Sequence, residues 1–405
     1  MNSVREIVEE MMKTIYLDNN ATTAVRPEVL QKMLPFFCER YGNPSSIHSF
    51  GGSVAADIEE ARRNCAELLG ARFRDKDNCA SEIIFTSCGT ESDNAALNAA
   101  LKARPGRNKI VTSAVEHPAI LHYCEELTRK GIEVVKVPVD ERGRLDMDFL
   151  EKAVDEKTAL VTLMWANNET GTIFPIAEAV QIAHRAGALC HSDAVQAAGK
   201  EEIDVDKIEI DFLSVSGHKL HAPKGVGILF VRRTVPFTPL IWGGHQERMR
   251  RGGTENTASI IGLGEACRLA LAEREEQQRK LAALRDRLER QVQEKIPCVR
   301  INGDVEHRLC NTSSISFEYI EGESILMLLD MNGICASSGS ACTTGSLEPS
   351  HVLRAMNVPY TAAHGTIRFS LSGANTEEEI DFTVECLVPA IARLRQISPY
   401  WKEEK

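Results

Sequence analysis

Between residues 81 and 192 the chain alternates between strand-like and helix-like segments, and this alternation constrains the fold more than any other feature. Short apolar segments that favour strands occur at 82–87, 109–114, 132–139, 159–164 and 188–192. Helix-favouring segments lie between them, at 90–103, 118–131, 149–154 and 176–185. A regular strand–helix alternation is typical of a largely parallel sheet with helices on both faces. The sequence therefore predicts an α/β fold for this part of the chain.

The pattern changes after Gly264. A long charged helix is expected from residue 265 to about residue 295, followed by strands and helices in mixed order at 313–317, 323–331, 366–370 and 377–396. This order favours a smaller α+β domain, with the long helix joining two domains rather than forming a coiled-coil arm. A chain of 405 residues exceeds what one compact core holds. We therefore expect a large domain at 15–264 and a small domain formed by 1–14 and 265–405.

Composition excludes several classes of protein. Hydrophobic residues make up 43% and charged residues 26%, as in soluble globular proteins, and the net charge of −11 argues against binding to nucleic acid. The sequence holds no signal peptide and no apolar stretch of about 20 residues, so we expect a cytoplasmic protein without a membrane partner. The 12 cysteines form no CxxC pair and no zinc-like pattern with histidines, so neither a structural metal nor a disulfide framework is expected.

Lys219 gives the strongest chemical signal. It follows an apolar strand-like segment at 210–215, and the carboxyl ends of strands are where open α/β sheets bind ligands. Asp193 ends another such segment 26 residues earlier. Pyridoxal phosphate needs this pair, a lysine for a Schiff base and a carboxylate that keeps the pyridine nitrogen protonated. An exposed surface lysine is the alternative, but the flanking Ser216 and His218 and the pairing with Asp193 favour the cofactor.

Two further turns fit the same cofactor. Gly89 and Thr90 lie at a strand-to-helix turn, where free backbone amides form an anion site suited to a phosphate. The alternative is a helix cap, with Thr90 and Asp93 as an approximate capping box. His117 ends the next strand, where its ring can stack on a flat cofactor, or it is a partly buried structural histidine.

Three polar residues are candidates for binding the cofactor's ring or a substrate carboxylate. Asn168 follows the strand that ends near Trp165, although an Asn-rich turn is an equal alternative there. Gln196 can donate to the cofactor's phenolic oxygen, whereas Asp193 nearby has a helix cap as its alternative role. Arg368 can hold a carboxylate through two hydrogen bonds, or it is an ordinary strand-edge arginine.

Cys342 is the second decisive residue. It lies among small polar residues at 337–346, which predict a mobile, exposed loop at about 335–349. An accessible thiol with a lowered pKa is a nucleophile. The alternative is an incidental surface cysteine.

These residues together resemble a known family, the NifS/IscS cysteine desulfurases, which are class-V aminotransferase-like enzymes of pyridoxal-phosphate (PLP) fold type I. The resemblance runs nearly the length of the chain, and somewhat favours NifS over IscS. It rests on YLDNNATT at 16–23, YGNPSSIH at 41–48, SGHK at 216–219, RGGTEN at 251–256, and SSGSAC at 337–342 followed by LEPSHVL at 347–353. The last is the most specific, and its long cysteine loop is the NifS/IscS form.

The resemblance implies a role for each matching position. Lys219 would bind PLP covalently and move a proton, Asp193 would pair with the pyridine nitrogen, and His117 would stack on the ring with Gln196 on its phenolic oxygen. The phosphate would be held by Gly89, Thr90, Ser216 and His218, and by Thr254 from the other subunit of an obligate homodimer. The substrate carboxylate would be oriented by Asn43, Asn168 and Arg368. Cys88 departs from the family, in which small residues are more usual at this position.

The resemblance also implies an activity, the conversion of L-cysteine to L-alanine with a persulfide on Cys342. The sulfur would pass to an iron–sulfur scaffold protein of the NifU/IscU type, and Cys342 would be a candidate transient ligand of the cluster. Two alternatives remain open: a selenocysteine lyase or other class-V PLP enzyme, and a non-catalytic platform for sulfur-assembly partners.

Overall fold

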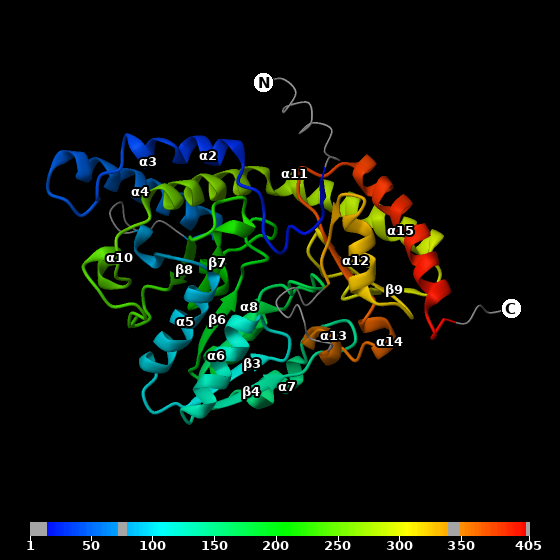
Figure 1. Cartoon of the computed structure of the whole chain (residues 1–405). Coiled ribbons are helices and arrows are strands. Elements are labelled where there is room, and N and C mark those ends of the chain that lie inside the picture. The colour runs from blue at the N-terminus through cyan, green and yellow to red at the C-terminus, as the bar shows by residue number, and fades with distance from the viewer. Residues whose placement is uncertain (1–13, 72–78, 339–348, 402–405) are drawn as a thin grey trace, which may run out of the picture.

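The computed structural model describes residues 14–71, 79–338 and 349–401 (Figure 1). Cys342 and the central part of its predicted loop therefore lie outside the described residues.

A seven-stranded sheet forms the centre of the larger part of the molecule. Its spatial order is β2-β8-β7-β6-β5-β3-β4, and all neighbours are parallel except β8, which is antiparallel to both β2 and β7. The strands are β2 (Ile83–Thr86), β3 (Lys109–Ser113), β4 (Glu133–Val137), β5 (Thr158–Met164), β6 (Leu189–Asp193), β7 (Phe212–Ser216) and β8 (Gly227–Val231). Every residue of β5, β6 and β7 is buried, as expected for parallel strands covered on both faces. The predicted α/β class is confirmed.

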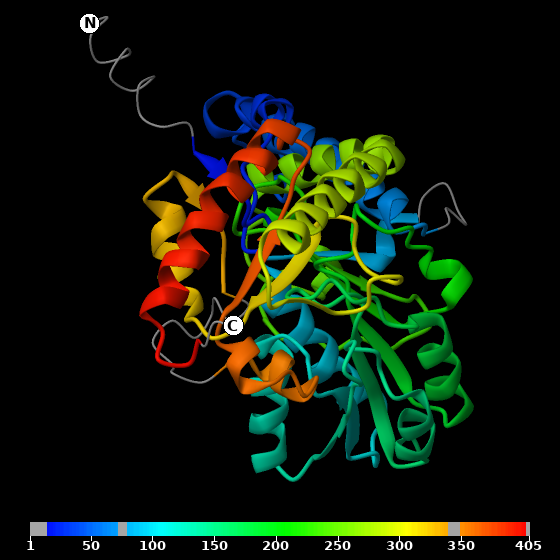
Figure 2. The same cartoon turned by 90° about the vertical axis from the view of Figure 1, so that its right-hand side faces the viewer.

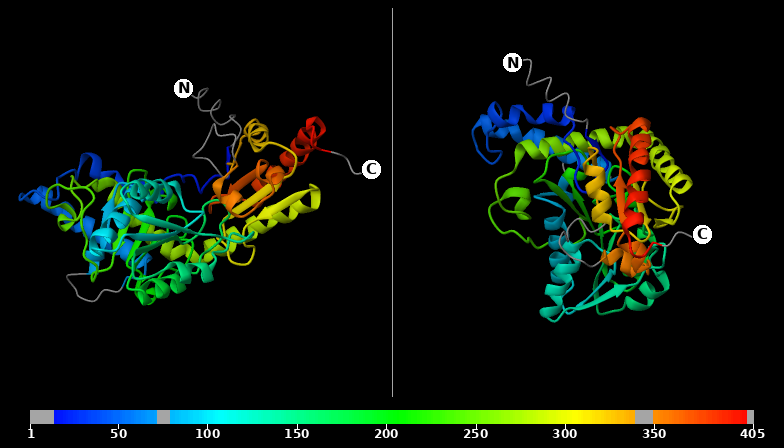
Figure 3. Two further views of the ribbon diagram at one scale, coloured as in Figure 1. Left: turned by 90° about the horizontal axis from the view of Figure 1, so that it is seen from below. Right: turned by 45° about the vertical axis from the view of Figure 1, so that its right-hand side comes forward.

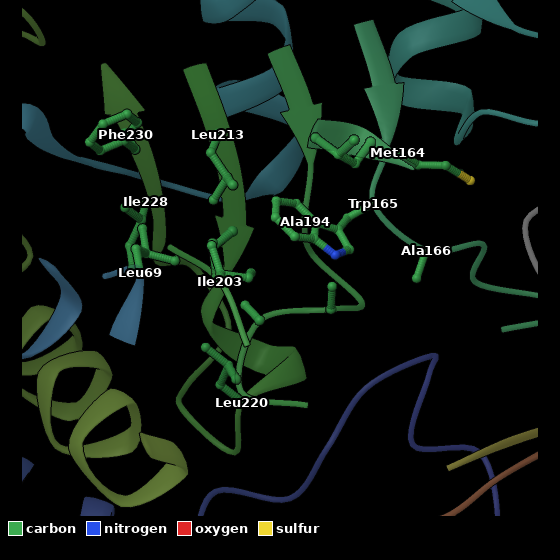
Figure 4. Close-up of a cluster of buried hydrophobic side chains, with 14 of the residues drawn as sticks. Leu69, Met164, Trp165, Ala166, Ala194, Ile203, Leu213, Leu220, Ile228 and Phe230 are labelled. Atoms are coloured by element: carbon green, nitrogen blue, oxygen red, sulfur yellow. The ribbon is translucent and has the colours of Figure 1, made fainter. Parts of the chain in front are cut away.

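Helices cover both faces because alternate strand residues point to opposite sides of the sheet. Ile84 and Leu160 share one core with α5 (Gly89–Ala103) and α6 (Pro118–Arg129). Ile83 and Val161 belong to the other face's core. That core includes residues of α2 (Pro27–Met33), α3 (Pro35–Cys38), α4 (Ser49–Leu68), α7 (Met147–Ala153), α8 (Ile176–Arg185), α9 (Val205–Ile208) and α11 (Thr257–Lys295). Figure 4 shows part of it, with Leu213, Ile228 and Phe230 projecting from β7 and β8.

A smaller part of the molecule has its own antiparallel sheet, ordered β12-β10-β9. The bounds are β9 (Val299–Asn302), β10 (Thr312–Phe317), α12 (Gly322–Asp330), β12 (Thr366–Ser370) and α15 (Glu377–Ile397), with two-residue strands β1 (Ile15–Tyr16) and β11 (Ile334–Cys335) paired in parallel. Short helices α10 (Gln246–Met249), α13 (His351–Ala355) and α14 (Tyr360–Ala363) complete the chain. Figure 2 shows α15 lying beside α12 and α11.

Helix α11 joins the two parts, as predicted for the long charged helix. Its residues 258–267 are buried with the large sheet, and Leu281, Leu284 and Leu288 pack in the core of the small one. In Figure 3 the N-terminal helices and α15 lie toward opposite ends of the molecule. The expected boundary at residue 264 falls inside this helix, and Ile15 packs with the small sheet. The division into domains at 15–264 and at 1–14 with 265–405 stays a prediction.

Among the described residues, no helix has the length and apolar character needed to cross a membrane.

Candidate active site

A cavity of about 530 Å³ opens where β5, β6 and β7 end and α5 begins. Most of the residues that the sequence singled out line it. They are Gly89, Thr90, His117, Asn168, Asp193, Gln196, Ser216, His218, Lys219 and Arg368. The carboxyl ends of parallel strands thus gather side chains from distant parts of the chain, as an open α/β sheet does.

Lys219 lies one short turn beyond β7, at Gly217–Lys219. Its Nζ donates to the backbone oxygen of Ala21 at 2.6 Å and to that of Asn20. Burial, and then repulsion from the neighbouring cations Arg368 and Lys200, lower the pKa of Lys219 to about 8. An amine with this pKa is partly neutral near pH 8, and only a neutral amine can act as a nucleophile or base.

Asp193 ends β6 and is 7% exposed. Its Oδ1 accepts a hydrogen bond from the backbone N–H of Val195 at 2.9 Å. The residues that follow form turns, so Asp193 does not cap a helix, which was its alternative role. Burial raises the pKa of Asp193, whereas His117 and Lys219 act in the opposite direction. A positive charge placed beside this carboxylate would therefore be strongly stabilised.

Two more carboxyl groups lie near Asp193, and neither was predicted to belong to the site. Asp93 also lines the cavity and is 1% exposed, with its Oδ1 at 3.6 Å from Nε2 of His191. Burial, and then repulsion from Asp193, raise its pKa well above the usual range. Burial raises the pKa of Glu116 to about 8. The pKa of Asp193 is raised too, but His117 and Lys219 oppose the effect of burial there, so Asp193 is the member of the cluster best placed to stay ionised.

His117 begins α6 and serves as its cap, since its Nδ1 accepts from the backbone N–H of Ala119 at 3.1 Å. Burial lowers its pKa, so the ring is neutral and its proton belongs on Nε2. His117 therefore caps a helix and also lines the cavity, and its stacking on a cofactor stays a prediction.

The start of α5 lies at the same cavity and lacks the capping box that was the alternative to a phosphate site. Cys88 is the N-cap residue and makes no side-chain capping bond, while Asp93 is turned into the interior. A Cβ added at Gly89 would lie 3.0 Å from Val195 and 3.4 Å from the Cβ of Ser216, so glycine allows this close approach. His218 has its Nδ1 at 3.1 Å from the Thr22 hydroxyl, and burial lowers its pKa to about 4. The backbone amides at the start of α5 have no side-chain acceptor, and hydroxyl and imidazole groups lie beside them. This set of donors suits an anion.

Arg368 lies at the opposite wall, on β12, and is 2% exposed. Its Nη2 donates to Oδ1 of Asp18 at 2.7 Å, and its Nη1 donates to the backbone oxygen of Asn168 at 3.1 Å. Its Nε has no partner among the described residues. Arg368 is therefore a fixed, buried cation rather than an ordinary strand-edge arginine.

Three predicted residues have a different setting. Asn43 is exposed outside the cavity lining, and its side chain accepts from the backbone N–H of Ser45 at 3.0 Å. Thr254 is also exposed and does not line the cavity. In Gln196, Nε2 donates one of its two hydrogens to the backbone oxygen of Asn20 at 3.0 Å, and the buried Oε1 has no partner among the described residues. Their roles stay predictions.

The chain belongs to the class-V aminotransferase family, whose pattern matches residues 15–382. Within that family it is similar to the cysteine desulfurase NifS of Azotobacter vinelandii, at 55% identity over 96% of each chain. A solved NifS-like protein is 40% identical, with a TM-score of 0.87 over 94% of this chain and 100% of its own. SspA, solved in complex with cysteine, is 32% identical, with a TM-score of 0.77 over 90% of this chain and 100% of its own. The resemblance to NifS-type proteins of PLP fold type I is confirmed.

Pyridoxal phosphate is the cofactor of this family, as the sequence predicts, and the cavity fits it. Lys219 has a depressed pKa, Asp193 is a buried carboxylate, and the first turn of α5 has no side-chain cap. These three features match the aldehyde, the pyridine nitrogen and the phosphate of the cofactor. A cavity that bound only apolar ligands would need none of these charged and polar groups.

Proposed function

We propose that this protein is a PLP-dependent cysteine desulfurase, which converts L-cysteine to L-alanine and leaves the sulfur as a persulfide on Cys342. One observation carries the proposal: Lys219, with a pKa of about 8, lines a single cavity together with the buried carboxylate of Asp193 and the buried cation of Arg368. The likeness to cysteine desulfurases over nearly the whole chain supports it.

Some side chains of the site would hold the substrate, and others would move its α-proton. Arg368, whose Nε is unpartnered, would bind the substrate carboxylate together with Asn168. Lys219 in its neutral form would take the α-proton onto Nζ, and its pKa of about 8 makes that form available near neutral pH. Bound PLP supplies an electron sink for the carbon that loses this proton. Asp193 would hold the proton on the pyridine nitrogen, and His117 would cover the ring.

Sulfur transfer requires Cys342 to reach this cavity. In that step a bond forms between Cys342 Sγ and the substrate sulfur, the substrate Cβ–S bond breaks, and Cβ takes up a proton to give alanine. Ser337, five residues before Cys342, exchanges backbone hydrogen bonds with Arg368 at 3.2 Å and 2.6 Å. Five residues span at most about 18 Å. A chain of this length is compatible with a Cys342 thiol that reaches the site.

We also propose a homodimer in which Thr254 contacts the partner's phosphate. Thr254 is exposed. Several large apolar side chains that precede it at 242–249, or that lie between α2 and α4, are exposed too, as expected of a surface that another chain covers. They are Leu34 (55%), Phe37 (57%), Tyr41 (66%), Ile47 (105%), Trp242 (73%) and Met249 (65%). A dimer in solution that loses cofactor affinity on Thr254→Ala would support this contact.

The sulfur acceptor is proposed to be an iron–sulfur scaffold protein of the NifU/IscU type in the cytoplasm, with Cys342 as a candidate transient cluster ligand. The relation to NifS-named proteins supports this choice. Transfer of radiolabelled sulfur from the loaded enzyme to such a scaffold, but not to an unrelated thiol protein, is the expected result.

The activity itself is tested with purified holoenzyme and L-cysteine, by following alanine and the visible absorbance of the cofactor. A spectral change and stoichiometric alanine are expected, and Lys219→Ala should abolish alanine formation. Two results together would instead indicate a selenocysteine lyase. The enzyme would form no alanine from L-cysteine, and L-selenocysteine would give a spectral change and selenide release that both persist in Cys342→Ala. A cofactor-free protein that binds scaffold but changes no substrate would indicate the non-catalytic platform.

A further inference from the structure

Pro349, Ser350 and His351 belong to the most specific motif of the sequence, yet none has a role in the chemistry described above. They are the first described residues after the segment that carries Cys342, and all three line the cavity. They also lead into α13, which begins at His351. We call residues 349–351 the stem.

The hydroxyl of Ser350 makes two hydrogen bonds, one as acceptor and one as donor. Its Oγ accepts from the backbone N–H of Val352 at 3.0 Å, which caps α13, and donates to Oε2 of Glu169 at 2.5 Å. Ser350 is 5% exposed and Glu169 is 4% exposed. A hydrogen bond between a hydroxyl and a buried carboxylate is among the stronger contacts of this kind, and losing it leaves the carboxylate without that donor.

His351 makes a second attachment. Its Nε2 lies 2.9 Å from the backbone oxygen of Glu116, which is the residue before His117. A carbonyl oxygen can only accept, so Nε2 carries the proton. Burial lowers the pKa of His351, which keeps the ring neutral in this position.

The two attachment points belong to the turns that form the site itself. Glu169 is in the turn whose neighbouring residue, Asn168, accepts from Arg368 through its backbone oxygen. Glu116 precedes His117, which lines the cavity and would cover the cofactor's ring. The stem is thus fixed at once to the substrate-binding turn and to the cofactor-binding turn. Pro349 lies seven residues after Cys342, a length that spans at most about 25 Å.

We propose that Ser350 and His351 are positioning residues for sulfur transfer, anchoring the stem of the Cys342 segment to Glu169 and to the Glu116 carbonyl. The inference rests on the proposed function. Neither side chain takes part in removing the α-proton. Their loss should therefore slow the step that needs Cys342 and leave the step that needs only Lys219 unchanged.

The two steps can be measured separately on the holoenzyme. Exchange of the α-proton of L-alanine with deuterium oxide, followed by NMR, reports Lys219 and the cofactor without Cys342. The rate at which Cys342 gains sulfur in a single turnover with L-cysteine, followed by mass spectrometry, reports sulfur transfer. Ser350→Ala should leave exchange within about twofold of wild type and slow persulfide formation by about tenfold, the loss expected for one such hydrogen bond. Ser350→Thr, which keeps the hydroxyl, should restore most of the rate.

Matched variants separate anchoring from general damage. Asp146 is the N-cap of α7, and its Oδ1 accepts a hydrogen bond from the backbone N–H of Phe149 at 2.9 Å. Asp146→Ala removes this cap and should change neither rate. His351→Ala tests the second attachment and should show the same pattern of rates as Ser350→Ala. It keeps the proposal testable if Ser350→Ala folds poorly. Equal losses of both rates in these variants, or no loss of either, would overturn the proposal. A wild-type enzyme that exchanges the proton but forms no persulfide would instead remove the proposed function.

Discussion

The depressed pKa of Lys219 implies that the active-site lysine destabilises the folded apoprotein. The perturbation is Lys219→Met, which keeps the length of the side chain and removes its charge. Lys219 has an ordinary value of 10.5 when unfolded and about 8 when folded, because burial and the nearby cations disfavour its ammonium form. The folded apoprotein thus holds an unfavourable charge at neutral pH.

The size and sign of the effect follow from these two pKa values. Between about pH 8 and pH 10.5 the unfolded chain binds one more proton than the folded chain, so stability rises with pH across this window. The cost is fully present below about pH 8 and absent above about pH 10.5, and it amounts to about 3 kcal/mol. The hydrogen bonds from Nζ to Ala21 and Asn20 offset part of it. We expect Lys219→Met to stabilise the apoprotein by about 1–3 kcal/mol at pH 7.

The assay is urea unfolding of the apoprotein and its variant at pH 7 and at pH 10. The advantage of the variant should shrink or reverse at pH 10, where wild-type Lys219 is largely neutral. Lys157→Met, at an exposed turn position, is the control and should change the free energy of unfolding by no more than about 0.5 kcal/mol at either pH. A variant equal to wild type or less stable at pH 7, or an advantage independent of pH, would refute the reasoning.

Three further changes have definite expected outcomes. Asp193→Asn removes the carboxylate that would hold the ring proton and should lower alanine formation by ~10²-fold or more without unfolding the protein, as checked by steady-state kinetics and circular dichroism. Arg368→Lys loses the planar fork that bonds Asp18 and Asn168 and should raise the KM for L-cysteine by about tenfold with a smaller change in kcat, whereas an effect on kcat alone would contradict carboxylate binding. Glu247→Gln removes the buried counter-charge of Arg62, bonded at 2.6 Å and 3.0 Å, and leaves only the more exposed Glu59 at 3.1 Å, so it should cost about 3 kcal/mol in urea unfolding. The control is Asp57→Asn, which breaks a more exposed ion pair and should cost less than about 1 kcal/mol.

The central sheet was predictable because its strands are continuous apolar runs separated by amphipathic helices. The predicted helix at 176–185 and strand at 366–370 have the observed ends. Helix α4 was not predicted, since half of its buried residues are small or weakly hydrophobic and its apolar stripe is interrupted by Arg62. Its contact with α11 depends on that smallness: a Cβ at Gly264 would lie 2.4 Å from Cα of Ala61.

The strand-end residues of the site were predictable because parallel strands end at one edge. The roles of Asp18, Asn20 and Glu169 were not predictable, because they arise only when distant segments of the chain come together. Asn20 offers its backbone oxygen to Lys219, 199 positions away, and Asp18 pairs with Arg368, 350 positions away. The alternative role of Asp93 in a capping box is wrong. A carboxylate in a first turn suggests capping, and only the fold reveals that Asp93 is buried.

The most direct test of the central claim is to incubate the holoenzyme anaerobically with one equivalent of L-cysteine and to map added sulfur by mass spectrometry. All 12 cysteines can be compared in one digest, including Cys88 beside the cofactor cavity. We predict alanine in proportion to enzyme and a persulfide on Cys342. Alanine with the sulfur on Cys88, or with no protein-bound sulfur, would contradict the account.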